Sequence, residues 1–554
     1  MLGSDIREPI VRTTSGVAHG LPGTWATALA TLMVLSMLGL LLWIVAVNAF
    51  GWFWPARVSQ LTLIDGEVVI GELVGRERVR GGVSDEDEGF RLQVKVGNRE
   101  VTGSDFRWID EDQIRAVSTP PEMVRVVRSE YGDAFGRIVG AVDADGRSVD
   151  HSSAEELEGL LTHGAELRAE RLDLERRLAT TRRPLTRLEE RLAMLERSDR
   201  AETPEGERRI EELSADMERE AVAVTPRLEE ISRRQDEVVR RLDAARITLE
   251  AGATTVEVPL ANVIRVVPSN GLGTAARLWH TLREGVLFLF TEPREANTEG
   301  GIFPALFGTV LLVLLMSLAV VPLGVITAVY MTEYARPGLL LRLANQAVNN
   351  LAGVPSIVFG MFGLAFFIYG VGGTLDRTFF ADRLPTPTFG TGGLLWASLT
   401  LALLTVPVVV VATREGLLAV PRNWRDGSLA LGATRWQTLR RIVLPASMPG
   451  ILTGMILAVS RAAGEVAPLM LTGAVKLAPS LPVDGTLPFL HLQRKFMHLG
   501  FHIYYVSMQS PNVEAAKPMA FATTLVLLAL VVVMNLAAII VRRRLRRAYR
   551  GQAV

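Results

Sequence analysis

The sequence DGSLALGATRWQTLRRIVLP, which runs from Asp426 to Pro445, lies between two long apolar segments. Gly432 follows Asp426 by six residues, and nine residues then separate Gly432 from Ile442, with Leu444 two positions later. Glycine permits a sharp turn or a close approach between two short helices. We therefore expect a helical loop with its turn at Gly432, held between two membrane-spanning segments.

Six apolar segments are long enough to cross a bilayer, which takes roughly 20 apolar residues each. They are about Trp25–Phe50, Phe303–Tyr330, Val348–Val371, Gly393–Ala412, Pro445–Leu471 and Ala520–Val541. The first run is longer than the ~7–15 apolar residues of a signal-peptide core. Aromatic residues at positions 50, 52, 53 and 54 are typical of a membrane interface. We expect an uncleaved anchor over 25–50 and a membrane core over 302–541.

Composition and missing motifs exclude several classes of protein. The chain has 554 residues, too many for one ordinary domain, and its net charge of +0 suggests no nucleic-acid partner. It has no cysteine, which excludes disulfides, thiolate metal sites and cysteine nucleophiles. Nucleotide-binding P-loop, H-E-x-x-H and G-x-S-x-G sequences do not occur. We expect no catalytic residue, cofactor or metal on this chain, and a solvated loop around His491, His498 and His502.

Arginine clusters predict the topology, because loops rich in Lys and Arg stay in the cytoplasm. Six arginines lie between spans four and five and six follow the last span: Arg414, Arg422, Arg425, Arg435, Arg440 and Arg441, then Arg542, Arg543, Arg544, Arg546, Arg547 and Arg550. With six spans, residues 1–24, the 414–445 loop and the basic 542–554 tail share the cytoplasmic side. Residues 51–300 then form an extracytoplasmic domain.

Short strands are predicted at both ends of this domain. Residues 57–118 alternate apolar and polar positions around the hairpin signal Asp65-Gly66, which indicates a small, highly curved β-unit. Residues 106–117 also resemble residues 256–267, at an offset of 150. We hypothesise a second β-unit that begins near residues 137–142 and ends in a strand return over 254–268. Chance alternation explains the resemblance about as well.

Between these strands, residues 154–246 predict an antiparallel coiled-coil hairpin. Leucines at positions 174, 178, 185, 188, 192 and 195 fall into heptad spacing, and a similar step follows a turn near residues 200–206. A docking arm for an external partner and a rigid spacer that binds nothing are both consistent with this pattern.

One charged pair lies inside an apolar segment. Arg461 and Glu465 are four residues apart, so on a helix they share a face and can pair. An ionised side chain inside a span is costly and usually faces a cavity or a partner. Arginine suits an oxyanion, because its planar fork donates two parallel hydrogen bonds. The pair predicts either a substrate pathway or a structural ion pair that fixes helix packing.

The 426–445 stretch resembles the EAA loop of ABC-importer permeases, whose pattern is EAA, three residues, Gly, nine residues and I-x-L-P. Here Asp426, Gly427 and Ser428 replace the EAA triplet. Within that class, residues from about 305 to 541 are similar to phosphate-importer permeases of the PstA type. The residues that carry the similarity are Pro322–Gly324 through Tyr334, Gly353–Gly360 and, above all, Arg461–Pro468.

The resemblance implies a six-helix membrane protein with a type I ABC-importer core, and an extracytoplasmic α+β domain after the first span. Relatives with such an extra domain exist. It implies a bacterial inner-membrane permease for inorganic phosphate that works with a second permease, two copies of an ATPase subunit that binds ATP and Mg, and an external phosphate-binding protein. Arg461 and Glu465 would line the pathway. The residues that would contact the ATPase are Asp426, Gly427, Ser428, Gly432, Leu444 and Pro445.

Two alternatives remain open at this point. Arginine suits sulfate, molybdate and phosphonate as well as phosphate, so a permease for another oxyanion is consistent with the same residues. A membrane-anchored coiled-coil scaffold whose spans do not transport is the alternative of a different class. The intact spacing between Gly432 and Pro445 argues against the scaffold.

Overall fold

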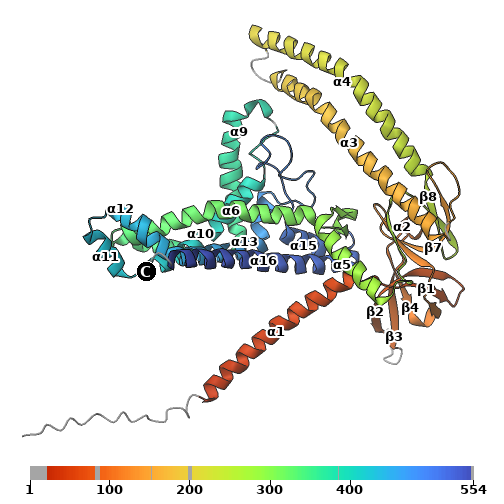
Figure 1. Cartoon of the computed structure of the whole chain (residues 1–554), viewed down its shortest axis with the longest axis horizontal. Helices are drawn as coiled ribbons and strands as arrows, with labels where there is room; N and C mark the ends of the chain where they lie inside the picture. Colours follow the sequence, from red (N-terminus) through yellow and green to blue (C-terminus); the bar gives the residue numbers. More distant parts are fainter. Residues whose placement is uncertain (1–20, 81–87, 151–152, 197–201, 385, 551–554) are drawn as a thin grey trace, which may run out of the picture.

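The computed structural model describes residues 21–80, 88–150, 153–196, 202–384 and 386–550 (Figure 1). A bundle of membrane helices forms one part, and a β-rich domain with a long helical hairpin forms the other. The β-rich domain is inserted between the first and second membrane helices. Residues 1–20 of the predicted N-terminal segment and 551–554 of the predicted basic tail lie outside the described residues.

Six helices in the described ranges are long and apolar enough to cross a membrane, which confirms the predicted number. These spans are Thr24–Phe53, Phe303–Tyr334, Ser356–Phe379, Leu394–Leu418, Arg435–Gly464 and Val513–Arg544. The helices that form them are α1 (Leu21–Phe53), α6 (Phe303–Val329), α8 (Ser356–Phe362), α9 (Gly373–Phe379), α10 (Leu394–Leu418), α12 (Arg435–Thr438), α13 (Leu444–Gly464) and α16 (Val513–Arg550). The π-helical segments are Tyr330–Tyr334 after α6, Gly363–Gly372 between α8 and α9, and Leu439–Val443 between α12 and α13.

The third span begins at Ser356 and not at the predicted Val348. The residues before it form a separate helix, α7 (Leu339–Leu351), whose Leu340 is 83% exposed. Pro355 explains the break, because proline disfavours helical backbone in the residue before it. Pro355 itself is the N-cap of α8, with φ −56° and ψ 138°.

Helix α10 lies at the centre of the membrane part. Its Leu401 and Val409 are fully buried, and they belong to one apolar cluster with Met316 of α6 and Ala458 of α13. Glycine brings these helices close together: a Cβ atom on Gly324 would lie 2.6 Å from the Val409 side chain. Close backbone approach of this kind is a common way to pack helices in a membrane, where lipid offers no hydrophobic drive.

Two five-stranded antiparallel sheets form the β-rich domain. Sheet A has the strand order β4-β3-β2-β1-β5, and sheet B has the order β9-β8-β7-β6-β10. The strands of sheet A are β1 (Val58–Leu63), β2 (Val68–Arg80), β3 (Glu88–Lys95), β4 (Phe106–Asp110) and β5 (Ile114–Ser118). Those of sheet B are β6 (Met123–Arg128), β7 (Ala134–Val142), β8 (Arg246–Ala251), β9 (Thr254–Pro259) and β10 (Val263–Val267). In each sheet four strands follow one another and the fifth returns beside the first.

The two sheets therefore share one pattern of connections. Strands β7 and β9 lie in the same sheet, as the hypothesis of a second β-unit requires. The offset of 150 residues relates β4 to β9 and β5 to β10. The helical hairpin enters between β7 and β8, which correspond to β2 and β3 of sheet A.

The hairpin consists of α3 (Ala154–Glu196) and α4 (Pro204–Ala244), which lie side by side (Figure 1). Arg234 of α4 pairs with Glu170 of α3 at 2.9 Å. The base of the hairpin packs tightly on the turn between β9 and β10, because a Cβ atom on Gly164 would lie 2.2 Å from the Leu260 side chain. Towards the other end, Cα atoms of α3 come within 8 Å of the short helix Ala381–Arg383 that follows α9.

Helix α5 (Thr274–Phe290) connects the β-rich domain to α6. The rings of Phe53 at the end of α1 and Phe288 of α5 are 5.3 Å apart, so the chain enters and leaves the domain at one place. The remaining elements are α2 (Arg99–Thr102), β11 (Pro293–Arg294), β12 (Glu299–Gly300), α11 (Arg422–Ala430), α14 (Ala467–Thr472), α15 (Leu499–Met508) and the 3-10 turns Glu111–Gln113 and Glu295–Asn297.

Candidate transport site and helical loop

Arg461 lies on the last turn of α13, inside the fifth membrane span. Its Nε is 3.2 Å from Oε1 of Glu465, and the two side chains are 34% and 18% exposed. The predicted pair is therefore formed, although Glu465 does not lie on the helix. It follows Gly464, where α13 ends, and has extended backbone with φ −76° and ψ 134°.

The end of α13 at Gly464 differs from the predicted span, which continued to Leu471. Helix α14 begins only at Ala467, with Pro468 in its first turn. Proline lacks an N–H group and is tolerated in a first turn, where no intrahelical bond is required. The two residues between the helices let the Glu465 carboxylate turn back onto Arg461.

Two glycines of the third span pack closely beside this break. A Cβ atom on Gly360 would lie 2.7 Å from the Cα of Pro468, and one on Gly363 would lie 2.3 Å from the Thr400 hydroxyl. Substitution at either position would force α8 away from α14 or α10. The third span is thus fixed next to the Arg461–Glu465 pair by close backbone contact.

The 414–445 loop contains two short helices joined by a turn. Helix α11 ends at Ala430, and Gly432 has φ 84°, a left-handed conformation that favours glycine. Thr434 starts α12 with a capping box: its hydroxyl accepts from Gln437 N, and Gln437 Oε1 accepts from Thr434 N. The spacing of the motif therefore corresponds to helix, glycine turn and cap.

The named residues of this loop occupy different positions. Asp426 and Gly427 are exposed on α11, whereas Ser428 is buried with its hydroxyl 2.9 Å from that of Thr438. Leu444 and Pro445 form the first turn of α13.

The loop also leaves apolar side chains uncovered. Leu439 is buried, whereas Trp436 is 58% exposed. Trp424 and Leu431 are 51% and 90% exposed. The loop therefore exposes three large apolar side chains.

An ion pair that the sequence did not suggest links the loop to the second span. Arg425 of α11 lies 3.1 Å from Glu333, in the π-helical end of that span, and also donates to the carbonyl of Leu417 at 2.6 Å. In the sequence, Arg425 stands out only as one member of a positive cluster. The only sign of this pair in the sequence is that Glu333, near the end of the second predicted span, and Arg425, in the loop, carry opposite charges.

The three histidines near residue 500 are not in a solvated loop, which corrects that prediction. His491, His498 and His502 are 6%, 0% and 2% exposed. His491 Nε2 lies 3.0 Å from Asp484 Oδ1. Within the described ranges no group of three or more His, Cys, Asp or Glu side chains is arranged to hold a metal.

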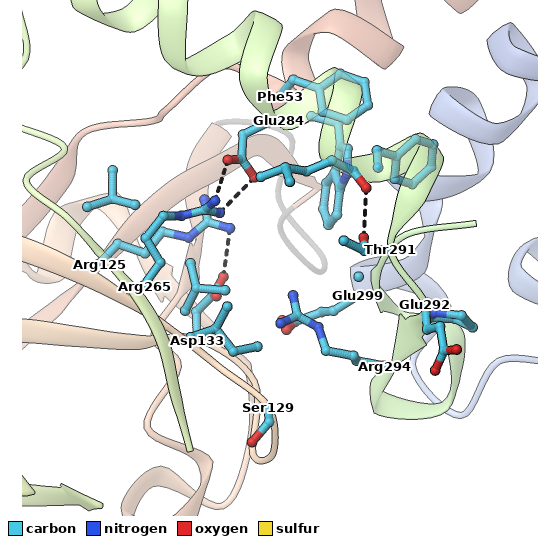
Figure 2. A pocket seen from close by; sticks show the side chains of 18 of the residues that line it. Phe53, Arg125, Ser129, Asp133, Arg265, Glu284, Thr291, Glu292, Arg294 and Glu299 are labelled. Atoms are coloured by element: carbon cyan, nitrogen blue, oxygen red, sulfur yellow. Dashed lines mark hydrogen bonds and ion pairs between the residues drawn. The ribbon is translucent and has the colours of Figure 1, made fainter. Parts of the chain in front are cut away.

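A cavity of about 570 Å³ lies where sheet B, α5 and the end of α1 meet (Figure 2). Two ion pairs form its polar wall: Arg125 with Asp133 at 3.0 Å and Arg265 with Glu284 at 2.6 Å. Figure 2 shows Arg294 pointing into the same space. None of this was predicted, because the partners come from separate strands and helices and follow no spacing.

Burial and charge shift the pKa values of this network in opposite directions. Burial acts to raise the pKa of Asp133, but the positive charges of Arg125 and Lys95 outweigh it and hold this pKa well below its ordinary value. Lys95 Nζ lies 2.6 Å from Asp133. Burial, together with the negative charge of Asp133, raises the pKa of Glu299 to about 7.

Residues 320–547 match the family model described as binding-protein-dependent transport system inner membrane component. A phosphate transport system permease protein PstA 1 from Mycobacterium tuberculosis (strain CDC 1551 / Oshkosh) is 34% identical over 289 residues, which cover 51% of this chain and 83% of that relative. A PstA from Mycobacterium leprae (strain TN) is 35% identical over 239 residues, covering 42% of this chain and 70% of that relative.

Solved ABC transporters are also similar to this chain. A chain of the MetNI methionine ABC transporter aligns with 17% identity and a TM-score of 0.32, over 44% of this chain and 97% of that chain. A bacterial alginate ABC importer aligns with 16% identity and a TM-score of 0.34. The identity to the mycobacterial permeases, over most of their length, decides the family. The chain is a multi-pass inner-membrane permease subunit of an ABC importer and belongs to the PstA type of phosphate transport system permeases.

Proposed function

We propose that this permease moves inorganic phosphate across the cytoplasmic membrane and that Arg461 is its phosphate-contacting residue. The observation that supports this most strongly is Arg461 itself: it is 34% exposed, lies where the fifth span breaks, and is paired with one carboxylate, that of Glu465. Arginine donates two parallel hydrogen bonds to an oxyanion. Glu465 competes for the same donors, so a passing phosphate is bound weakly enough to leave. The mycobacterial relatives are phosphate transport system permease proteins, which supports phosphate as the anion.

Uptake of radiolabelled phosphate tests this proposal. Cells that lack their own copy of the chain are compared with and without it restored, and sulfate is added as competitor. Restored uptake that sulfate does not reduce supports phosphate. Sulfate competition would favour a permease for another oxyanion, and a correctly inserted chain that restores nothing would contradict the proposal.

The energy for transport comes, in this proposal, from a separate ATPase that docks on the 414–445 loop. The chain has no P-loop sequence of its own. The exposed Trp424, Leu431 and Trp436 offer an apolar contact surface, and the Arg425–Glu333 pair links that surface to the second span. Purification through this chain should recover an ATPase. Failure to recover one from intact membranes would favour the scaffold alternative.

We further propose that both termini and the 414–445 loop are cytoplasmic, with residues 51–300 outside. Arginines on the loop and at the C-terminal end of α16 support this orientation. A second permease and an external phosphate-binding protein would complete the transporter. Because the chain is free of cysteine, a single cysteine can be placed at Val222 in the hairpin or at Ala430 in the loop. A membrane-impermeant thiol reagent on intact cells should label only the first.

A further inference from the structure

Helix α5 has an apolar face that no described residue covers. Five large side chains on it are 55–71% exposed: Leu278, Trp279, Leu282, Val286 and Phe290. At 100° per residue they fall within about 120° of the helix circumference, the width of a continuous apolar stripe. No acidic residue lies within that arc. We call these five side chains the apolar stripe.

The opposite face of α5 already has its partner in the β-rich domain. Arg277 is buried and donates to the carbonyls of Leu272 and Ser269 at 3.1 and 2.9 Å. Glu284 pairs with Arg265 of β10. The polar face therefore lies inward and the apolar face outward, the reverse of a surface helix on a water-soluble domain.

The position of α5 places the apolar stripe beside the membrane. The amide of Ile302 donates to the carbonyl of Phe288, and that of Phe303 donates to Thr291, so the last turn of α5 is bonded to the start of the second span. Phe288 also packs on Phe53, where the first span ends. Figure 1 shows α5 at the meeting point of α1, α6 and the β-rich domain.

We propose that the apolar stripe is immersed in the bilayer and that α5 is an interfacial helix that fixes the β-rich domain to the lipid surface. The end of α1, which contacts α5 through Phe53 and Phe288, also exposes aromatic side chains: Phe50 is 58% exposed, and Trp54, just after the helix, is 41% exposed. Tryptophan and phenylalanine are typical of the interface between headgroups and acyl chains. Five large apolar side chains exposed side by side are rare on a surface that faces water.

Single-cysteine spin labelling tests the immersion directly, because the natural chain contains no cysteine. Leu282→Cys and Val286→Cys report on the apolar stripe. Leu38→Cys, in the first span, is the lipid control. Val222→Cys is the water control, since Val222 is an apolar residue on α4 that is 72% exposed. Ala276→Cys, exposed on α5 outside the stripe, is the control on the same helix.

The full-length chain, with the subunits that co-purify, is placed in nanodiscs of phosphatidylcholine and phosphatidylglycerol. Label accessibility is then measured to oxygen, which partitions into lipid, and to a water-soluble nickel chelate. We expect oxygen to exceed the nickel chelate at positions 282, 286 and 38, and the order to invert at 222 and 276. Nickel access at 282 and 286 would place the stripe in water and overturn the proposal. Exclusion of both reagents would mean that a protein subunit covers it, which overturns the proposal equally.

Discussion

At the scale of single residues, the Arg461–Glu465 pair can be tested by graded substitution. Arg461→Ala removes both the positive charge and the planar guanidinium group. Arg461→Lys keeps the charge but loses the two parallel hydrogen bonds. We expect the alanine variant to lose phosphate uptake by about tenfold or more, with the lysine variant between it and the natural chain. Glu465→Gln frees Arg461, so phosphate should bind more tightly and leave more slowly.

The measurements are initial uptake rates and phosphate affinity of the purified complex. Co-purification of the other subunits is the control for assembly. A fully active Arg461→Ala variant that assembles normally would show that the pair only fixes helix packing.

Glu299 gives a prediction about pH. Its pKa is about 7 in the folded protein, against an ordinary value of 4.5, so the folded form holds the proton across this range. The protonated form of Glu299 stabilises the fold. The free energy of unfolding therefore falls by about 3 kcal/mol in total as pH rises from about 4.5 to 7. Asp133, whose pKa is lowered, does not titrate in this window.

Glu299→Gln should remove that loss, because glutamine carries no charge at any pH. We expect the variant to melt at a higher temperature than the natural chain at pH 8 and at nearly the same temperature at pH 5. Thermal unfolding of the purified chain at the two pH values measures this. A difference in melting temperature that does not change with pH would show that Glu299 is already ionised at pH 5.

The sequence identified some of these residues and not others for a physical reason. Arg461 and Glu465 stand out because ionised side chains are rare within an apolar run. Asp133 and Glu299 lie in a block where charged residues are common. Lys95 ends β3 of sheet A and Asp133 precedes β7 of sheet B, so their 2.6 Å contact forms only when the two sheets pack together. No spacing in the sequence could predict that pair.

At the scale of elements, the turn in the 414–445 loop depends on one glycine. Gly432→Ala places a side chain at φ 84°, which costs roughly 1–2 kcal/mol. The turn between α11 and α12 should loosen, and phosphate uptake should fall while the membrane helices stay folded. Uptake and ATPase co-purification measure the effect.

Gly427→Ala is the matched control for folding, because Gly427 lies within α11 with no heavy atom near its missing Cβ. Alanine is the better helix former by roughly 0.5–1 kcal/mol, so this variant should be neutral or slightly stabilised. If both variants reduced uptake equally, the effect would come from the docking surface and not from the turn.

Hydropathy predicted the six spans but not where two of them break. Length and apolarity decide whether a segment can cross the membrane, and all six met that condition. The breaks before Ser356 and after Gly464 depend on Pro355 and Pro468, each of which sits inside an apolar window that hydropathy averages over. Proline positions, weighed against the apolar pattern, would have placed both ends better.

At the scale of the whole molecule, the hairpin can be shortened without disturbing its base. Contacts of α3 and α4 with sheet B lie near the base, where Leu160, Leu167 and Leu242 are buried. The Glu170–Arg234 pair joins the two helices just beyond these contacts. Removal of residues 179–225, with a short turn between 178 and 226, should leave the melting temperature of the chain nearly unchanged.

The same truncation removes the part of α3 that extends towards the short helix after α9. If the hairpin serves transport, phosphate uptake should fall although the domain stays folded. Unchanged uptake would show that the hairpin is a spacer. Loss of the folded domain would contradict the assignment of its stability to the base.

The weak repeat in the sequence anticipated the most regular feature of the domain. Alternating apolar residues at an offset of 150 correspond to paired strands in two sheets of the same order. The sequence could not reveal how α3 reaches the membrane core, because that contact joins residues more than 180 positions apart and depends on the curve of the hairpin.

This reach has a mechanical consequence. The base of the hairpin packs on sheet B, and α3 also contacts the short helix that follows α9, at the C-terminal end of the third span. A rigid hairpin that is fixed to sheet B and also contacts a movable membrane helix can transmit displacement in both directions. A tilt of α9 would therefore displace the hairpin and, with it, the β-rich domain. A force on that domain would in turn be transmitted to the third span, whose glycines lie against α14 beside Arg461.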